Sequence, residues 1–171
     1  MMSVCQSFDP IEPAYMRVLI LGSMPGRASL EAQAYYAHRR NGFWPIMGAL
    51  LQQDWADDFA QRYRDLQQQH IGLWDVLAEC ERPGSLDAAI RAYSIQINDI
   101  PGLVLRHPEC QLIALNGNKA ADLFRRYALK THPAIFNSIQ VVALPSTSPA
   151  HAQMSLQDKT QVWRDKIANF L

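Results

Sequence analysis

The chain has 171 residues, of which 49% are hydrophobic and 19% charged, and its 16 Lys and Arg residues balance 16 Asp and Glu residues. This composition excludes a disordered chain, a collagen-like repeat and a small disulfide-held scaffold, because a chain of this length buries roughly 70% of its unfolded surface in one core. The net charge of zero also argues against a protein that coats nucleic acid through bulk positive charge. We expect one domain over residues 1–171, with residues 1–16 as an extended N-terminal segment.

Four short apolar runs have the composition of strands that are buried on both faces. Stretches with helical spacing separate them, which is typical of βαβ units and predicts an α/β fold with a parallel sheet. The predicted strands cover residues 17–22, 71–76, 110–115 and 139–144. The predicted helices cover residues 43–53, 55–70, 117–129 and 155–171.

The last helix begins with Ser155 and Asp158 at the spacing of a capping box. Residues 79–103 are harder to interpret, because prolines and glycines interrupt two short helical patterns around residues 86–93 and 100–106.

Ligands bind to an open parallel sheet beyond the carboxyl ends of its strands, so the segments that follow the predicted strands are the candidate site. The first is GSMPG at residues 22–26, which fits either a plain tight turn or a turn whose backbone approaches a ligand. It has neither the GKS/GKT of a phosphate-binding loop nor a GxGxxG pattern. Aromatic and cationic residues follow within residues 35–44, a mixture that suits stacking on a base beside phosphates.

The second candidate segment is PSTSPAHA at residues 145–152. Its three hydroxyl residues lie between two prolines, which suits a rigid contact with phosphate oxygens. An ordinary polar loop fits these residues equally well.

Taken in order, GSMPG, YYAHRRNGFWPIMG, LWDVLAECERPGSLDAAI, NGNKAADLF and LPSTSPAHA resemble the hypoxanthine-DNA glycosylase family, the sixth family of the uracil-DNA glycosylase superfamily. The similarity covers nearly the whole chain from Arg17 to the final helix. Two positions depart from related patterns. Met24 stands where the mismatch-specific enzymes have a water-positioning Asn, and His151 stands where this family has an Asn.

The resemblance implies a three-layer α/β/α sandwich with a four-stranded parallel sheet. It also implies a monofunctional enzyme that hydrolyses the N-glycosidic bond of a flipped deaminated base in DNA, with hypoxanthine first and uracil or xanthine as further substrates, and that leaves an abasic site. It implies no cofactor and no metal, and Cys5, Cys80 and Cys110 are too few for the four-cysteine iron–sulfur cluster of some relatives.

The resemblance maps the catalytic, water-positioning role onto Asn41. For the base, we expect Tyr36 to stack on one face, while the backbone around Ser23 and Met24, together with Ser146, contacts the edge. Asp75 could accept a hydrogen bond from a purine N1–H, or it could merely cap a turn at the end of its strand.

For the DNA backbone, we expect Thr147, Ser148 and His151 to grip the phosphates that flank the flipped nucleotide, with Ala150 and His151 near the vacated base stack. Arg39 and Arg40 are further candidate phosphate contacts, although paired arginines on a loop are often only solvated.

The expected partner is DNA with a deaminated base, and we expect a soluble monomer. Three widely spaced cysteines favour a reducing compartment, and neither a signal peptide nor a membrane span is recognisable. These features indicate a bacterial-type cytosol, in association with the nucleoid.

Two other functions compete with this one. A catalytically silent module that binds nucleic acid or nucleotides on the same fold is suggested by Met24 and His151. A serine hydrolase is less well supported, because the chain has no GxSxG motif.

Residues 17–44 carry four arginines and a single acidic residue. A net charge of zero for the whole chain is therefore compatible with one positively charged side of the molecule.

Overall fold

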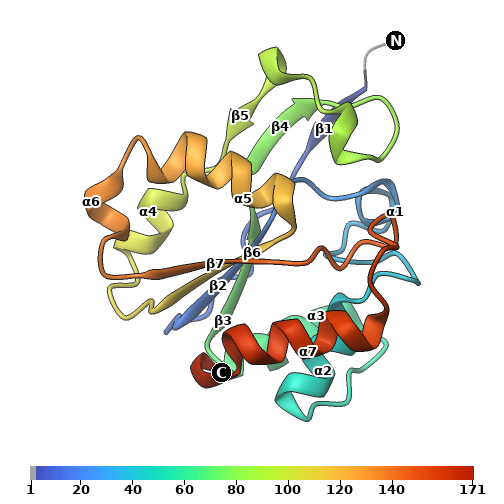
Figure 1. Ribbon diagram of the computed structural model, residues 1–171, viewed down its shortest axis with the longest axis vertical. Helices are drawn as coiled ribbons and strands as arrows, with labels where there is room; N and C mark the ends of the chain where they lie inside the picture. Colours follow the sequence, from blue (N-terminus) through green and yellow to red (C-terminus); the bar gives the residue numbers. More distant parts are fainter. Residues whose placement is uncertain (1–2) are drawn as a thin grey trace.

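The computed structural model describes residues 3–171 and has a four-stranded parallel sheet at its centre (Figure 1). Its strands are β2 (Val18–Gly22), β3 (Ile71–Asp75), β6 (Leu112–Asn116) and β7 (Gln140–Leu144), in the order β3-β2-β6-β7. The four strands are the four apolar runs, with bounds that differ from the expected ones by at most two residues.

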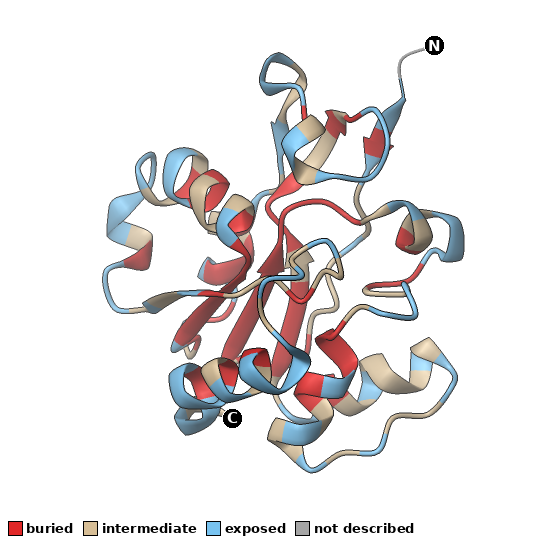
Figure 2. Cartoon of the chain, turned by 45° about the vertical axis from the view of Figure 1, so that its right-hand side comes forward, coloured by how far each residue is buried: buried red, intermediate tan, exposed pale blue. Residues whose placement is uncertain are grey.

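Each central strand divides its side chains between two cores. In β2, Val18 and Ile20 pack on one side of the sheet, and Leu19 and Leu21 pack on the other. All four are at most 1% exposed. Figure 2 shows these buried strands at the heart of the molecule, and this double burial explains why the runs are continuously apolar.

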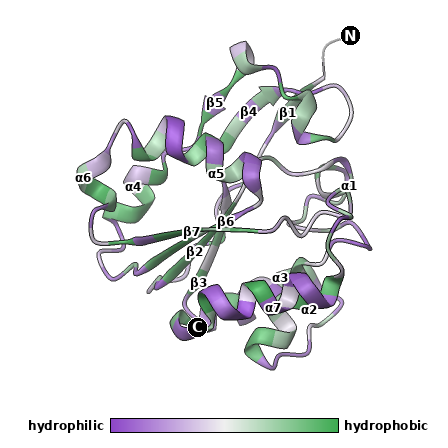
Figure 3. Cartoon of the chain, in the orientation of Figure 1, coloured by the Kyte–Doolittle hydropathy of each residue, from purple (hydrophilic) through white to green (hydrophobic). Residues whose placement is uncertain are grey.

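Three helices cover one face of the sheet: α2 (Phe43–Leu51), α3 (Phe59–Gln68) and α7 (Leu156–Ile167). The helix α3 begins later than expected, because Asp58 caps it by accepting a hydrogen bond from the backbone N–H of Ala60. The cap of α7 is the expected one, since the Ser155 hydroxyl accepts from the backbone N–H three residues later. Figure 3 shows polar residues concentrated on outer helices such as α7 and apolar residues along β7.

The opposite face carries α4 (Ile100–Leu105), α5 (Asn118–Phe124) and α6 (Pro133–Phe136). One π-helical turn, Arg125–Leu129, continues α5. Helices on both faces make the central part a three-layer α/β/α sandwich, as expected.

A second, antiparallel sheet was not expected from the sequence. It has the order β1-β4-β5 and consists of β1 (Val4–Gln6), β4 (Leu77–Glu81) and β5 (Gln96–Ile97). The expected helical pattern over residues 86–93 is wrong: this segment forms two single 3-10 turns, Asp87–Ala89 and Ala92–Ser94.

The reason for that difference is that the segment follows β4 closely. The backbone N–H of Arg91 bonds to Glu81 O, so the chain runs back along the small sheet and leaves no room for a continuous helix. A further short helix, α1 (Arg27–Ala32), follows the GSMPG turn and is not among the predicted helices. No helix within residues 3–171 is long and apolar enough to cross a bilayer.

Candidate active site

The main cavity, of about 490 Å³, opens where the carboxyl ends of the central strands meet. The strand order reverses between β2 and β6, which is where ligands bind in open parallel sheets. The turn after β2, the end of β3, the end of β6 and the loop after β7 all contribute to its wall. On Figure 1 this is the right-hand side, where β7 runs into the following loop. Four segments singled out in the sequence are therefore brought together.

The floor of the cavity consists of Gly22, Tyr36 and Asp75. The Asp75 side chain is only 4% exposed, and its Oδ2 has no hydrogen-bond partner among residues 3–171. A Cβ atom on Gly22 would lie 2.5 Å from Asp75 Oδ1 and 3.3 Å from the Tyr36 hydroxyl. Only glycine at this position lets the two polar groups lie directly over the end of β2.

The environment of Asp75 favours its protonated form. Its pKa is raised to about 7, first by burial and then by the negative charge of Asp87, while the positive charge of Arg82 lowers it. Near neutral pH this carboxyl group can therefore both donate and accept a hydrogen bond. A buried polar group that lacks a partner is unusual and costly, which makes Asp75 a candidate functional residue.

Tyr36 is held in a backbone conformation that few residues adopt, with φ of 54°. Its ring stacks on Phe43 with centroids 4.0 Å apart and planes 18° from parallel. The hydroxyl is buried without a partner among the described residues, and burial, followed by the charge of Asp75, raises its pKa. One face of the ring is thus covered by Phe43, while the side chain also lines the cavity.

Asn41 lines the cavity just before α2. Its side-chain Oδ1 accepts a hydrogen bond of 2.9 Å from the backbone N–H of Phe43, and its own backbone N–H donates to His38 O at 2.9 Å. These two bonds fix the orientation of the amide group. One lone pair of Oδ1 and the two N–H groups of the amide remain for a ligand or a water molecule.

The GSMPG turn is held from outside by the segment 82–88, which we call the rim segment. Ser23 donates its hydroxyl to Asp87, 2.8 Å from both carboxylate oxygens, and Met24 is 6% exposed and packs in the core. Arg82 donates to Pro25 O at 2.5 Å. Arg82 and Asp87 were not singled out in the sequence. The pattern that could have indicated them is the ERPGSLD stretch, where polar residues surround a Pro-Gly turn directly after an apolar run.

The loop after β7, residues 145–152, is held by the protein itself. Thr147 is 2% exposed, and its hydroxyl and backbone N–H form two 3.0 Å hydrogen bonds with the side chain of Asn116. Its carbonyl accepts from the backbone N–H of Gly42. The Thr147 side chain therefore points into the protein, which differs from the phosphate contact expected for it. Ser146 Oγ accepts from the backbone N–H of Ser148.

The remaining predicted residues lie around the mouth of the site. Arg39 and Arg40 are exposed, and the half-buried His151 lines the cavity together with Ser148. Lys159, from α7, donates to Ser148 O and steadies the loop. Within residues 3–171, no group of three or more His, Cys, Asp and Glu side chains is arranged to hold a metal ion.

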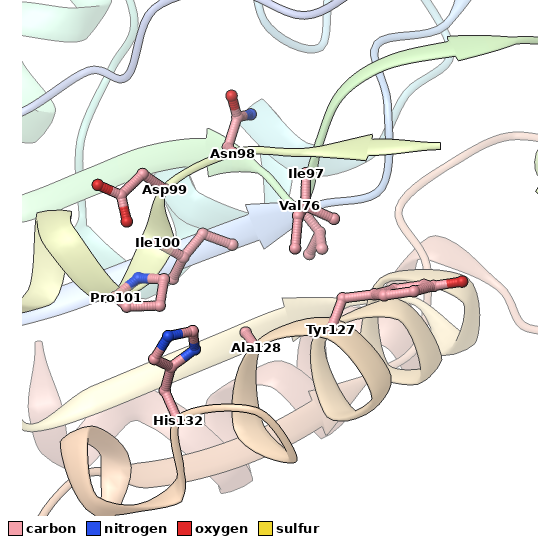
Figure 4. A pocket seen from close by; sticks show the side chains of 9 residues that line it. All are labelled: Val76, Ile97, Asn98, Asp99, Ile100, Pro101, Tyr127, Ala128 and His132. Carbon is pink, nitrogen blue, oxygen red and sulfur yellow. The ribbon is translucent and has the colours of Figure 1, made fainter. Parts of the chain in front are cut away.

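A second, smaller cavity of about 250 Å³ lies on the side of α4 and the π-helical turn (Figure 4). Its wall is mostly apolar. The Asn98 side-chain N–H groups donate to the carbonyls of Asp75 and Leu77 and to the Ser7 hydroxyl. Asn98 therefore links the wall of this cavity to the backbone of Asp75, which forms part of the floor of the main cavity.

Comparison with known proteins gives one consistent picture. A family model described as "Uracil DNA glycosylase superfamily" matches residues 9–171. A protein of Methanosarcina acetivorans named "Hypoxanthine DNA glycosylase" is 34% identical over 154 residues, which are 88% of this chain and 90% of that protein. A protein of the same name from Methanosarcina barkeri is 33% identical over 118 residues, 68% of this chain and 73% of that one.

Among solved structures, the fold is similar to a solution NMR structure of a candidate uracil DNA glycosylase from Methanosarcina acetivorans. The TM-score is 0.75 at 30% sequence identity, and the match covers 95% of this chain and 98% of the other.

Proposed function

Because the chain belongs to the uracil-DNA glycosylase superfamily and is therefore a DNA repair glycosylase, we propose that the base it releases is first of all hypoxanthine. The observation that carries this proposal is the buried Asp75 carboxyl group, which lies in the floor without a partner for Oδ2. The names of the two Methanosarcina relatives support the same substrate.

Hypoxanthine presents an N1–H donor beside a C6=O acceptor, and a neutral carboxyl group is the complement of that pair. One carboxyl oxygen accepts from N1–H, while the carboxyl O–H donates to O6. When ionised, Asp75 still accepts from N1–H. The ionised form is the one that discriminates against adenine, because its charge repels the lone pair at adenine N1, whereas a neutral carboxyl group can donate to that lone pair. Uracil and xanthine carry similar N–H and C=O pairs, so they are secondary substrates in this proposal.

Tyr36 would form the platform for the flipped base. Its ring already stacks on Phe43, so a base on its other face would extend the stack. Aromatic stacking on a base contributes about 1–3 kcal/mol and does not depend strongly on the base. Affinity would thus come from Tyr36 and selectivity from Asp75, with Ser146 and the backbone at Ser23 and Met24 along the edge.

Cleavage of the C1′–N bond develops positive charge on the sugar and negative charge on the leaving base. Asn41 is too weak a base to remove a proton from water. Its fixed amide can nevertheless orient a water molecule and present its oxygen to the cationic sugar, so that the rate comes from positioning and fixed dipoles. A protonated Asp75 would stabilise the negative charge on the leaving base.

The mouth of the site would hold the DNA backbone. Ser148, His151, Arg39 and Arg40 are the groups that reach it, whereas Thr147 acts by keeping the loop in place. All the named groups belong to one chain, which supports action as a monomer. Its substrate places the enzyme with the chromosome, in the cytosol.

The test is excision from duplex oligonucleotides that bear one hypoxanthine, uracil or xanthine, with abasic sites revealed by alkali. We expect hypoxanthine to be released fastest, and Asn41→Ala to slow release by about 10²–10³-fold. Asp75→Ala, which removes both the donor and the acceptor, should slow hypoxanthine release by about tenfold or more and leave binding to undamaged DNA unchanged.

Two outcomes would contradict the proposal. Release of uracil in preference to hypoxanthine would overturn the assigned substrate. Tight binding to damaged duplexes without release of any of the three bases would favour the catalytically silent module instead. Asp57→Ala, which removes an exposed carboxylate away from the cavity, is the matched control for Asp75→Ala.

A further inference from the structure

The rim segment 82–88 carries a positive charge that the fold buries almost completely. Arg82 is only 1% exposed. Its Nη2 donates to Pro25 O, but Nε and Nη1 have no hydrogen-bond partner among residues 3–171. None of the ion pairs within that range includes Arg82. Because a buried charge without a counter-ion is rare and costly, packing alone does not explain this arginine.

The position of Arg82 is fixed from both ends of its residue. Its backbone N–H donates to Ser3 O at 3.2 Å, and its carbonyl accepts from the Ser3 hydroxyl at 2.8 Å. The guanidinium in turn holds the carbonyl of Pro25 in the GSMPG turn. Pro25 lines the main cavity and Arg82 does not. The charge therefore acts on the cavity through the turn and without touching a bound base.

The turn that Arg82 holds presents donors to the cavity. Ser23 and Met24 both line it, and their backbone N–H groups have no hydrogen-bond partner within residues 3–171. Backbone N–H groups that point at one place attract negative charge. A fixed cation behind them strengthens that attraction, since the site is shielded from water and its dielectric constant is low.

The same charge also acts on the carboxyl groups of the site. Burial raises the pKa of Asp75 and of Asp87, and the positive charge of Arg82 lowers both. The hydroxyl groups of Tyr35 and Tyr36 also face Asp75 and are neutral, because burial raises the pKa of each. The positive charge that acts on Asp75 therefore comes from Arg82.

We propose that Arg82 is a positioning residue that fixes the GSMPG turn and supplies, from behind it, the positive charge that offsets the negative charge developing on the leaving base. This proposal rests on the proposed function. A carboxylate paired with Arg82 would cancel its field, so the absence of an ion pair preserves the effect. The cation is in place before the reaction, and no reorganisation is needed when the bond breaks.

The first test separates the charge of Arg82 from its bulk and its hydrogen bond. Arg82→Lys keeps the charge, Arg82→Gln keeps a donor for Pro25 O, and Arg82→Met keeps only the length. Under single-turnover conditions, Arg82→Gln and Arg82→Met should release the base that the wild type releases fastest about tenfold or more slowly. The enzyme concentration that gives half the maximal rate should stay within about twofold. Arg82→Lys should keep most of the rate.

A purely structural role predicts a different result. Replacement of a buried unpaired charge by an apolar side chain of similar size is often neutral or stabilising, so the urea midpoint of Arg82→Met should equal or exceed that of the wild type while its rate falls. Arg126→Met removes an exposed cation that does not line the cavity and should match the wild type in rate.

The second test does not depend on excision. In protein with ¹³C-labelled aspartate carboxyl groups, NMR follows the titration of Asp75, whose signal is assigned by its absence from Asp75→Asn. The midpoint should lie about one pH unit higher in Arg82→Gln and Arg82→Met, because the charge that lowers the pKa is gone. It should stay close to the wild type in Arg82→Lys. If the midpoint moves while the wild type releases no base, the charge acts on the floor and the proposed function fails.

The role of Arg82 is contradicted if Arg82→Gln releases the base at the wild-type rate, or if the Asp75 midpoint is the same in all three variants. It is also contradicted if a stable Arg82→Lys is as slow as Arg82→Gln, since the shape of the guanidinium and not its charge would then be required. Circular dichroism melting of each variant, with rates measured well below the transition, excludes misfolding as the cause of a lost rate.

Discussion

The floor of the cavity and Thr147 in the loop after β7 both contain buried polar groups, but these groups differ in whether they have hydrogen-bond partners. In the floor, Asp75 Oδ2 and the Tyr36 hydroxyl lack partners among the described residues. In the loop, Thr147 is bonded twice to Asn116 and once to Gly42. Thr147 has its hydrogen-bond partners within the protein, whereas the floor keeps two groups for a ligand.

This difference indicates that the floor is suited to recognise a base, whereas Thr147 is suited to support the loop. An unpartnered buried carboxyl or hydroxyl group costs roughly 1–3 kcal/mol in the free protein, and a base that supplies the missing partner recovers that cost on binding. Thr147, whose bonds are made within the protein, gains nothing from a new partner, but it holds the backbone of its loop in a fixed shape. Changes in the floor should therefore alter activity most, and changes in the loop should alter stability.

The largest effect is expected where a methyl group would fill the floor. Gly22→Ala places a Cβ within 2.5 Å of Asp75 Oδ1, so the carboxyl group must move away from the base. We expect release of hypoxanthine to fall about 10²-fold and the free energy of unfolding to fall by about 1–3 kcal/mol. In urea denaturation, Gly26→Ala should retain the wild-type midpoint, because its Cβ would meet Ser85 Oγ at an ordinary 3.5 Å.

The next effect concerns pH and the buried carboxyl group. An aspartate in an unfolded chain ionises near pH 3.9, and folded Asp75 has a pKa of about 7. Between these values the folded state holds the extra proton, so stability falls as pH rises towards 7 and then levels off. Asp75→Asn should remove this contribution, which amounts to a few kcal/mol, and flatten the profile.

Urea midpoints measured from pH 4 to pH 8 check this prediction, with the exposed Asp57→Asn variant following the wild type. A wild-type contribution that instead rises with pH would mean that the Asp75 carboxyl is stabilised in its ionised form.

In the loop, Thr147→Val should cost stability more than catalysis. It leaves the buried Nδ2 of Asn116 without its acceptor, which lowers the free energy of unfolding by about 1–3 kcal/mol. Thr160→Val, which removes a partly exposed hydroxyl bonded within α7, should cost less. Thermal melting measures both variants. A Thr147→Val enzyme of normal stability that releases no base would contradict the supporting role of the loop.

The smallest effect is expected at the exposed arginines of the mouth. Arg39→Ala and Arg40→Ala should each weaken duplex binding several-fold at low salt and reduce the dependence of log K on log salt by about one. Fluorescence anisotropy against salt concentration measures the slope. The exposed Arg126, which does not line the cavity, provides the control, and equal slopes for Arg39→Ala, Arg40→Ala and Arg126→Ala would remove the two arginines from the interface.

The central fold was readable from the sequence because burial on both faces leaves a continuous apolar run. The four runs became β2, β3, β6 and β7, and the Ser155 cap started α7 as expected. The small sheet was not readable, because its strands are two to five residues long and half-exposed. Such strands are defined by pairing across the chain, as Cys5 opposite Cys80 shows, and not by a local pattern.

The residue types of the site were also evident in the sequence, because an amide, a tyrosine, a buried strand-end aspartate and a hydroxyl-rich loop stand in recognisable motifs. The positions of these residues relative to one another, and the hydrogen bonds between them, were not evident in the sequence. Only the tertiary structure brings Arg82 and Asp87 against the GSMPG turn, turns Thr147 inward onto Asn116, and leaves Asp75 Oδ2 without a partner among residues 3–171. The sequence determined which strands are buried and which polar groups follow them, since these depend on neighbours in the chain. Which of those groups are satisfied and which are free depends on contacts between distant segments, and those contacts exist only in the folded protein.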